Sequence, residues 1–419
     1  MNPRIAAAEL LVAVMDHGRA LDDALVETQS FNALTGRDRA FARALVTAGI
    51  RHLGGVNAVL SRFLERPLPE SATHARALLH LGATQLLVLG TPPHAAVGET
   101  VEAANSLRQA RGFAKLMNAV LRRVAREGAE MLAALPAGAD LPAWLYTRWR
   151  AAYGEDAPRI AQALQQEPPL DLTVKSDAEG WAEKLNGVVT PTGSVRLTSP
   201  APIESLPGFA DGAWWVQDAA AALPARLLSD ISGKRVLDLC AAPGGKTLQL
   251  TAAGAHVTAV DKSEPRLKRL RENLERTKLE AEVICADALA FSAAPFDAIL
   301  LDAPCTSTGT LRRHPDVAWL RRPSDIQALA DLQAKLIAAA VQLLKPGGVL
   351  VYAVCSLEPE EGPGIVAQAL QSGWRRAPLT PAEIPSEFIT TDGDLRTHPA
   401  HWPERGGLDG FYAARLQRD

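Results

Sequence analysis

The sequence predicts a multi-domain protein with an all-helical N-terminal domain, a small α+β domain, and a C-terminal α/β domain built on a parallel sheet. Apolar residues recur at helical spacing through the first third of the chain, without the alternation typical of half-buried strands. Short continuous apolar runs, typical of buried parallel strands, follow from about residue 233 onward. The length of 419 residues also exceeds that of one average domain.

The helical domain is expected over residues 1–134. Helical spacing of apolar residues predicts helices at Arg4–His17, Asp38–Phe63, Thr73–Leu89 and Phe113–Glu127. Proline-containing breakers at residues 66–69 and 90–93 separate these segments. The second domain is expected over residues 143–232, with strands at Leu170–Lys175, Ser194–Leu197 and Trp214–Val216. The third domain is expected over residues 233–419.

The run Asp238–Lys246 joins the apolar strand Val236–Leu239 to a helical segment, Thr247–Ala253. Two adjacent glycines at this junction let the backbone turn sharply and approach a ligand closely. The next strand ends at Asp261, where an acid can accept hydrogen bonds from ribose hydroxyls. A Gly-Gly pair alone is equally typical of a tight turn. Together with the acidic strand end, it indicates a Rossmann-like nucleoside-binding site.

A phosphate-binding loop is the competing interpretation of this run. Gly245-Lys246-Thr247 matches the end of that motif, and Asp302 follows an apolar strand as a metal-binding aspartate would. The first glycine of the motif would fall at Cys240, however, and Pro243 lacks a backbone N–H that should cradle phosphate. The loop geometry therefore excludes a phosphate-binding loop.

Two cysteines, Cys305 and Cys355, follow the expected strands Phe296–Leu301 and Val349–Val354. Ligands of open α/β sheets bind at these carboxyl ends. A thiolate can add to carbon 6 of a pyrimidine and make carbon 5 nucleophilic toward a methyl donor. Cysteine suits this role because it both attacks and departs readily. The two thiols therefore favour methylation of a pyrimidine carbon.

The remaining cysteines have simpler interpretations. We expect the side chains of Cys240 and Cys285 to be small buried hydrophobic groups. The four cysteines of the chain show no C-x-x-C pairing, so no metal site is expected. Disulfides are not expected either, because the chain is long and shows no secretory leader.

Asp238–Lys246, Asp302-Ala-Pro-Cys305 and Cys355-Ser356 together resemble the RNA 5-methylcytosine methyltransferases of the Sun/NOL type. The resemblance implies S-adenosylmethionine as cofactor, with Cys355 as nucleophile, Cys305 as the thiol that assists release, and Asp302 as a contact of cytosine and cofactor. It also implies that Asp261 binds the ribose and that Asp287 lies near the adenine. The cofactor-binding residues implied are Cys240, Ala241, Ala242, Pro243, Gly244, Gly245, Lys246, Asp261, Asp287 and Asp302.

Two points remain open within this resemblance. In DNA cytosine methyltransferases a Pro-Cys thiol is itself the nucleophile, which would give that role to Cys305; the order of motifs favours Cys355. The family usually has threonine before the nucleophile, where this chain has Val354.

Farther along, Asp409–Arg415 alternates around two aromatic residues and predicts a strand in a hairpin. Val216–Leu228 is similar to the helical segment that precedes the cofactor loop in the family.

The segment Phe113–Arg123 resembles the last helix of the NusB-like RNA-binding domain that is fused to bacterial 16S rRNA cytosine methyltransferases. Asn118 and Arg122 are four residues apart and therefore share one helix face. The resemblance implies that the substrate is small-subunit ribosomal RNA. The alternatives are a tRNA cytosine-5 methyltransferase with the same core, and an RNA-binding ribosome-assembly factor without catalysis.

Charge is consistent with an RNA partner only locally, because the net charge is −3. Residues Arg108–Arg126 include six basic and no acidic side chains, and Leu311–Arg322 includes four arginines beside Trp319. We expect these two stripes to contact phosphate, and the second to hold an unstacked nucleotide. The chain lacks a long uncharged apolar run that would span a membrane. We therefore expect a cytoplasmic monomer that binds RNA, without a membrane or a metal partner.

Overall fold

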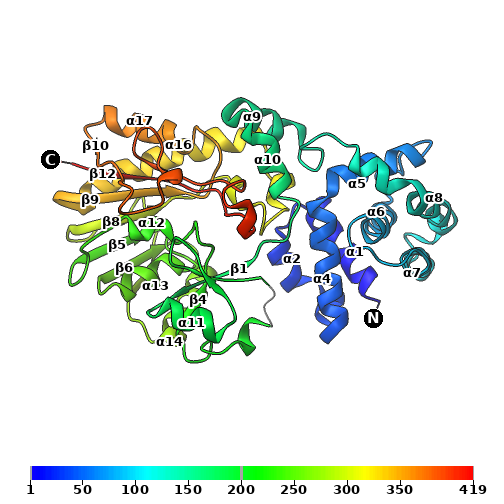
Figure 1. The fold of residues 1–419 in the computed structure, drawn as a ribbon, viewed down its shortest axis with the longest axis horizontal. Helices are drawn as coiled ribbons and strands as arrows, with labels where there is room; N and C mark the ends of the chain where they lie inside the picture. Colours follow the sequence, from blue (N-terminus) through cyan, green and yellow to red (C-terminus); the bar gives the residue numbers. More distant parts are fainter. Residues whose placement is uncertain (1, 199–201, 419) are drawn as a thin grey trace. The chain divides into compact units, whose positions relative to one another are not determined.

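The computed structural model describes residues 2–198 and 202–418, which form two compact units (Figure 1). The first unit runs to Gln166 and also includes Leu311–Arg322. The second unit comprises the rest of the described chain, with Glu167–Thr310 and the residues from Pro323 onward. Among the described helices, none combines the length and the apolar character that crossing a bilayer requires.

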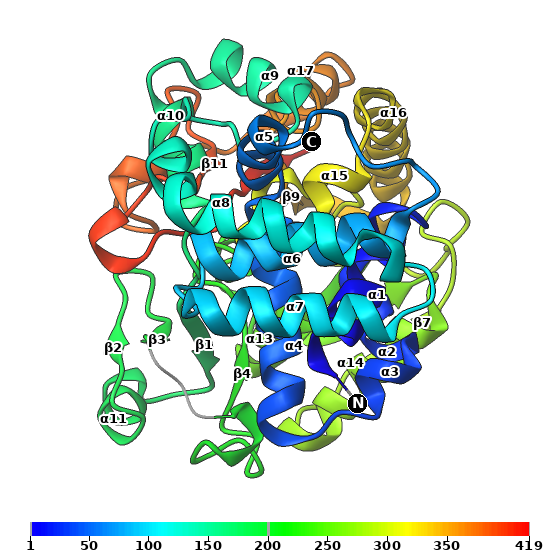
Figure 2. The ribbon, with the colours of Figure 1, turned by 90° about the vertical axis from the view of Figure 1, so that its right-hand side faces the viewer.

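The first unit is all-helical, as the sequence predicted, and α6, α7 and α8 lie side by side in it (Figure 2). Its core is built from small and branched apolar side chains of α1 and α4–α8. The proline pair at residues 92–93 separates α6 from α7, and Pro93 is the first residue of α7, where its missing N–H costs nothing. The helices are α1 (Pro3–Met15), α2 (Leu21–Glu27), α3 (Gln29–Asn32), α4 (Gly36–Arg51), α5 (Leu53–Phe63), α6 (Thr73–Leu87), α7 (Pro93–Ser106), α8 (Ala114–Ala133), α9 (Ala143–Tyr153), α10 (Asp156–Ala163) and α15 (Val317–Leu320).

The expected helix over residues 38–63 is interrupted at His52, between α4 and α5. The Asp140 side chain accepts a hydrogen bond from the Gly55 N–H at 2.9 Å and lies 3.3 Å from the His52 ring. A side chain at Gly54 would place its Cβ 2.0 Å from the Ala139 carbonyl oxygen. The loop before α9 therefore packs directly on the start of α5, and a buried carboxylate provides the acceptor that this new helix start needs.

The segment Leu311–Arg322 packs within the helical unit, and the expectation that it holds a nucleotide stays a prediction. Asp316 accepts a hydrogen bond from the Leu21 N–H at 2.9 Å, and Arg51 donates to the Arg312 carbonyl oxygen at 2.9 Å. Trp319 and Leu320 pack against the helical core, and Arg312 is buried. The aromatic side chain expected to stack on a base is therefore part of the packing of this unit.

The second unit contains an eight-stranded sheet with the order β10-β12-β9-β8-β5-β6-β7, in which β11 pairs with β12. Strands β7, β6, β5, β8 and β9 are parallel to one another, and β12 is antiparallel to β9. The strand order reverses at β5, which is where such sheets bind ligands. The strands are β5 (Arg235–Leu239), β6 (His256–Asp261), β7 (Glu282–Cys285), β8 (Phe296–Asp302), β9 (Leu344–Val354), β10 (Arg375–Arg376), β11 (Leu395–Arg396) and β12 (Tyr412–Gln417).

Helices cover both faces of this sheet (Figure 1). Side chains of β8 alternate between the two faces: Ile299 and Leu301 belong to one hydrophobic core, and Ala298 and Leu300 to the other. Burial on both faces explains why these strands are continuous apolar runs in the sequence. The helices are α12 (Leu223–Arg226), α13 (Gly245–Ala252) and α14 (Glu264–Thr277) on one face, and α16 (Pro323–Ala340) and α17 (Pro363–Gln371) on the other.

A small antiparallel sheet with the order β2-β3-β1-β4 precedes the large one, together with α11 (Ala178–Lys184). Arg196 and Asp171 form a fully buried ion pair at 2.6 Å, and Arg196 also donates to the carbonyl oxygens of Arg405 and Gly407, at 2.9 Å each. The small sheet is thereby tied to the segment before β12. Its strands are β1 (Leu170–Val174), β2 (Val188–Val189), β3 (Val195–Leu197) and β4 (Trp214–Val216).

The helical segment expected over Val216–Leu228 is much shorter in the structure, where α12 covers only Leu223–Arg226. Asp171 accepts a hydrogen bond from the Ala219 N–H at 2.9 Å, and Asp218 accepts one from the Ala220 N–H at 2.8 Å. These carboxylates hold the backbone in a turn and compete with helix formation there.

Candidate active site

The two cysteines of the predicted site meet because their strands are neighbours. Asp302, the last residue of β8, lies opposite Ala353 of β9 in the parallel ladder. Cys305 follows β8 by three residues, and Cys355 directly follows the last residue of β9. Their sulfur atoms are 3.4 Å apart. One pyrimidine ring can therefore be reached by both thiols.

The two thiols have different environments. Cys305 is buried, with 6% of its surface exposed, whereas Cys355 is half-buried. A hydrogen bond from Cys305 lowers the pKa of Cys355, with a smaller contribution from Ser307. The same thiol pair and burial raise the pKa of Cys305. Cys355 is therefore the thiol that ionises first and is the better nucleophile near neutral pH.

Ser307 was not singled out in the sequence, yet its hydroxyl lies at both thiols. The Oγ atom is 3.6 Å from the Cys355 sulfur and 4.0 Å from the Cys305 sulfur. Its backbone is in the left-handed region, with φ of 61°. This backbone conformation disfavours β-branched residues. No sequence pattern indicates the conformation, because it is imposed by the fold of the loop.

Gly309 allows the two cysteine loops to approach each other closely. Its N–H donates to the Cys355 carbonyl oxygen at 3.0 Å, and its own carbonyl accepts from the Gly410 N–H at 2.7 Å. A Cβ at Gly309 would lie 2.0 Å from the Gly410 carbonyl oxygen. The strand predicted over residues 409–415 begins later in the structure, because β12 starts at Tyr412. Gly410, just before β12, makes the contact with Gly309.

The expected cofactor loop lies between β5 and α13 and is held by the end of β6. Ala241 donates to the Val260 carbonyl oxygen, and Ala242 donates to the Asp261 carboxylate, both at 3.1 Å. Gly244 has φ of 106°, and a Cβ there would meet Leu270 of α14 at 2.7 Å. Cys240 is half-buried in the left-handed region, and Pro243 is exposed.

The acidic side chains at the strand ends differ in their partners. Asp261 is buried and accepts from Ala242 and from the Ser263 N–H at 2.9 Å. Asp287 is exposed and accepts from the Leu289 N–H at 3.0 Å. Each carboxylate oxygen has two acceptor sites, so both groups keep capacity for a ligand hydroxyl or amine.

Asp238 differs from both because it is fully buried and only partly satisfied. Its Oδ2 accepts from the Thr247 hydroxyl at 2.6 Å, whereas no described residue donates to its Oδ1. Burial raises the pKa of Asp238 to about 7. A buried acceptor without a protein partner at the switch point of the sheet indicates a ligand donor there.

Asp302 and Lys246 form an ion pair of 2.7 Å between the end of β8 and α13. The Lys246 ammonium also lies 5.1 Å from the centre of the Phe411 ring. The structure thus joins a residue expected to bind the cofactor with one expected to contact cytosine and cofactor. Both charges influence Cys355 as well: Lys246 lowers and Asp302 raises the pKa of that thiol.

Cys285 lies outside this cluster, and its interpretation as a buried hydrophobic group was wrong. Its side chain is exposed at the end of β7, the edge strand of the sheet, where no further strand of the described residues pairs. Cys240 is half-buried. In the described parts of the chain, no group of three or more His, Cys, Asp or Glu side chains is placed to hold a metal ion.

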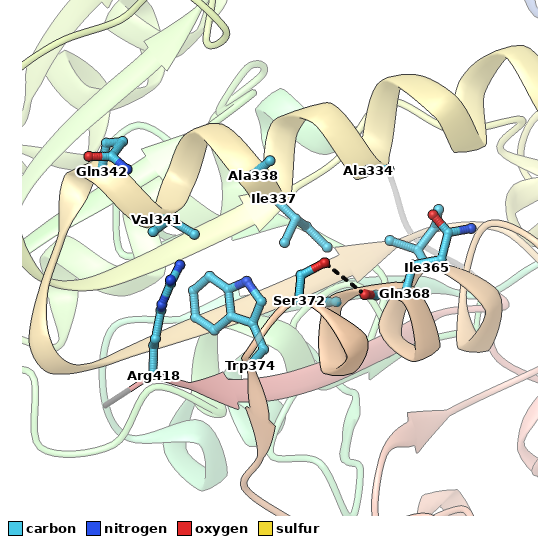
Figure 3. Close-up of a pocket in the computed structure, with 11 residues that line it drawn as sticks. Ala334, Ile337, Ala338, Val341, Gln342, Ile365, Gln368, Ser372, Trp374 and Arg418 are labelled. Carbon is cyan, nitrogen blue, oxygen red and sulfur yellow. Dashed lines mark hydrogen bonds between the residues drawn. The ribbon is translucent and has the colours of Figure 1, made fainter.

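A cavity of about 250 Å³ lies between α16 and α17 and contains none of the predicted site residues (Figure 3). Its lining is mainly apolar, with Ile337 and Trp374 among its side chains. The candidate active site is the cluster of side chains at the carboxyl ends of the strands, and the cavity between α16 and α17 is separate from it.

Comparison with known proteins gives matches along nearly the whole chain. The model of the family "16S rRNA methyltransferase RsmB/F" matches residues 225–417, that of the NusB family residues 1–126, and that of the RsmF/B-like ferredoxin-like domain residues 141–186. The ribosomal RNA small subunit methyltransferase B of Vibrio cholerae is 40% identical, covering 100% of this chain and 98% of that protein. Its counterpart in Vibrio vulnificus is 38% identical, covering 99% of both.

A solved structure titled PH0851 covers 100% of this chain and 99% of its own, with a TM-score of 0.78. Its sequence is 22% identical, so the likeness establishes the fold. The all-helical, small α+β and α/β parts expected from the sequence are thereby confirmed as the architecture of the chain, and the small α+β part matches a ferredoxin-like domain.

Proposed function

This chain belongs to the RsmB/F family of 16S rRNA methyltransferases, and from that membership we propose how its residues methylate carbon 5 of a cytosine. The protein is an S-adenosylmethionine-dependent enzyme that acts on small-subunit ribosomal RNA. The relatives described above are named for that RNA, which favours it over the tRNA alternative and over a non-catalytic assembly factor. The single observation that carries the residue roles is the 3.4 Å separation of the Cys305 and Cys355 sulfurs.

The residues of the first strand ends fit the cofactor. The unsatisfied Asp238 Oδ1 offers an acceptor to a cationic ligand, and Gly244 lets the loop turn tightly against Leu270 of α14. We propose that residues 240–246 hold the cofactor, with Asp261 at the ribose hydroxyls and Asp287 near the adenine. S-adenosylmethionine supplies the electrophilic methyl group when it is bound.

Cys355 begins the reaction as a thiolate that attacks carbon 6 of the cytosine. An S–C6 bond forms, and the electron pair of the C5–C6 double bond becomes available at carbon 5. After carbon 5 is methylated, a base removes its proton, the double bond re-forms, and Cys355 leaves as a thiolate. We assign Cys305 to this release step and Asp302 to the cytosine edge, where a hydrogen bond stabilises the charge that develops on addition.

The helical unit supplies the RNA-binding surface in this proposal. All six basic side chains of residues 108–126 are exposed, and Arg122 donates to Asn118 at 3.1 Å on the face predicted for both. Exposed cations on one segment attract the phosphate backbone. We further propose a cytoplasmic monomer with domains at residues 1–134, 143–232 and 233–419.

Covalent trapping on 16S rRNA tests the two thiol roles. With S-adenosylmethionine present, the Cys305→Ala variant accumulates a protein–RNA adduct that survives denaturing electrophoresis, because addition proceeds and release does not. The Cys355→Ala variant forms no adduct and transfers no methyl group. Cys285→Ala is the matched control, since its exposed thiol lies outside the site, and it behaves as the wild type.

An adduct that persists in Cys355→Ala and disappears in Cys305→Ala would reverse the assignment and make Cys305 the nucleophile. Bisulfite sequencing of ribosomal and transfer RNA from cells that lack the protein locates the target. A mark lost from tRNA alone would contradict the rRNA substrate.

A further inference from the structure

We propose that Glu361 is the positioning residue that holds the two cysteine-bearing loops together, so that both thiols reach one cytosine. This inference rests on the proposed roles of Cys305 and Cys355. Glu361 lies in the loop between β9 and α17, five residues after Ser356, and its side chain touches the neighbours of both cysteines. It does not touch the reacting atoms, so its contribution is to geometry.

On the first loop, Glu361 binds the residue that follows Cys305. The Thr306 N–H donates to Oε1 at 2.9 Å, and the Thr306 hydroxyl donates to Oε2 at 2.5 Å. Two donors from one residue fix both the backbone and the rotamer of Thr306. The path from β8 to Ser307 therefore has a defined direction directly after the thiol.

On the second loop, Glu361 binds the residue that follows Cys355. The Ser356 hydroxyl donates to Oε2 at 2.5 Å and accepts from the Glu358 N–H at 3.0 Å. Because Oε2 receives both hydroxyls, Thr306 and Ser356 are bridged through a single oxygen atom. The two residues after the catalytic thiols are thereby held at one point.

A third element fixes the carboxylate itself. Gln333 of α16 donates from Nε2 to Oε1 at 3.0 Å and to the Pro304 carbonyl oxygen at 2.8 Å. Tyr352 of β9 donates to the main-chain carbonyl of Glu361. The carboxylate is thus anchored to a rigid helix and a central strand, which is how positioned sites keep their geometry.

Burial makes this arrangement sensitive to change. Glu361, Thr306, Ser356 and Gln333 each have 0% of their surface exposed. Burial raises the pKa of Glu361, while its hydrogen bonds act in the opposite direction. Removing the carboxylate would leave four buried donors without their acceptor, and water does not reach them to compensate. We expect the two loops to shift relative to each other in response, because the carboxylate that binds Thr306 and Ser356 would be gone and only direct contacts, such as that of the Gly309 N–H with the Cys355 carbonyl oxygen, would still join them.

The test compares Glu361→Ala and Glu361→Gln in methyl transfer to 16S rRNA, at a temperature well below the Tm of either variant. Displacing a catalytic group by about 1 Å lowers the catalytic rate by about 100-fold, so we expect the kcat of Glu361→Ala to fall by about that factor. The Kd for S-adenosylmethionine should not change. Glu361→Gln should recover most of kcat, because its oxygen can accept from Thr306 and Gln333 while the two hydroxyls turn to accept from its amide.

A second measurement reads the distance between the thiols without catalysis. Diamide oxidises two adjacent thiols to a disulfide and is itself reduced to the hydrazine, taking up both protons and both electrons. In the wild type, with sulfurs 3.4 Å apart, Cys305 and Cys355 should cross-link readily. In Glu361→Ala the cross-linking rate should fall by about 10-fold or more, because the loops are displaced. Glu361→Gln should cross-link at close to the wild-type rate.

Asp171→Ala is the matched control for loss of a buried carboxylate. It breaks the Arg196 ion pair in the small sheet and lowers Tm, but it touches neither cysteine loop. Equal losses of kcat and cross-linking in Asp171→Ala and Glu361→Ala would show a general effect on stability and overturn the proposal. Unchanged kcat in Glu361→Ala would overturn it as well.

Ser356→Ala keeps the proposal testable if Glu361→Ala does not fold. It removes one of the four donors and should lower kcat and the cross-linking rate by a smaller factor than Glu361→Ala, and wild-type values for both would contradict the bridge. Failure of the underlying thiol roles gives a different result. Methyl transfer by Cys355→Ala would refute the proposed function whatever the Glu361 variants show.

Discussion

Asp238 and Glu361 are both buried carboxylates near the carboxyl ends of the parallel strands, yet they are satisfied to different degrees. Glu361 receives four hydrogen bonds on its two oxygens from Thr306, Ser356 and Gln333. Asp238 receives one from Thr247 on Oδ2, and no described residue donates to its Oδ1. We infer that the saturated buried carboxylate organises the protein, whereas the half-satisfied one marks a place for a ligand.

The difference follows from the position of each group in the fold. Asp238 is in β5, where the strand order reverses and the sheet opens toward a ligand. Glu361 follows β9 and is enclosed by α16 and by the loops after β8 and β9. Three experiments test whether the two carboxylates differ in this way.

The largest effect is expected for Asp238→Asn on cofactor affinity. Hydrogen bonds to a charged group contribute about 1.5–3 kcal/mol, so the Kd for S-adenosylmethionine should rise by about 10- to 100-fold. Because the pKa of Asp238 is raised to about 7, wild-type affinity should increase between pH 6 and 8, and the variant should lose this dependence. Isothermal titration calorimetry measures both. An equal loss of affinity in Glu361→Gln would remove the distinction between the two carboxylates.

In the cofactor-free protein, Asp238 should contribute more than Glu361 to the pH dependence of the free energy of unfolding. The pKa of Asp238 is about 7 in the folded chain and about 4 when unfolded, so the folded state holds the proton more tightly. Its contribution to the free energy of unfolding is therefore largest below pH 4 and is lost as pH rises toward 7. Urea unfolding at pH 5 and 7.5 should show a smaller decrease for Asp238→Asn than for the wild type.

Glu361→Gln is the comparison for that experiment. Burial raises the pKa of Glu361, but three hydrogen-bond partners counteract it, so removing this group should change the pH slope less. A larger change for Glu361→Gln than for Asp238→Asn would contradict the contrast.

The smallest effect is expected for Ser307→Ala. Its hydroxyl lowers the pKa of Cys355, as a secondary contribution after Cys305. Losing one such hydrogen bond should move the inflection of iodoacetamide labelling to higher pH by about one unit or less. Labelling at Cys355 is read by mass spectrometry in a Cys285→Ala background, which removes the exposed thiol. An unchanged profile would show that Ser307 does not stabilise the thiolate.

Much of the catalytic sheet was predictable because its strands are local patterns. The runs Val236–Leu239, Phe296–Leu301 and Val349–Val354, and the run that ends at Asp261, predicted β5, β8, β9 and β6, although β9 begins five residues earlier, at Leu344. Burial on both faces produces continuous apolar runs that a single sequence displays. The helical spacing of the N-terminal third was equally visible, although it did not reveal the break at His52, which depends on Asp140 far along the chain.

Other features were decided by contacts between distant residues. The sequence Glu-Pro-Glu-Glu at residues 358–361 is typical of an exposed loop, so no local signal indicated that Glu361 is buried. The basic and aromatic residues at 311–322 predict a nucleotide contact, and no local signal indicated that Trp319 packs against the core of the helical unit. The sequence pattern predicts a buried Cys285, but this side chain is exposed because β7 is an edge strand among the described residues.

Apolar runs along the chain set the strands, and they therefore specify which side chains stand at the strand ends. Three facts emerge only when the chain is folded: β8 and β9 are neighbours, their thiols lie 3.4 Å apart, and one carboxylate binds the residue after each thiol. Strand formation depends on adjacent residues, whereas strand order and the satisfaction of buried polar groups depend on residues about 50 positions apart.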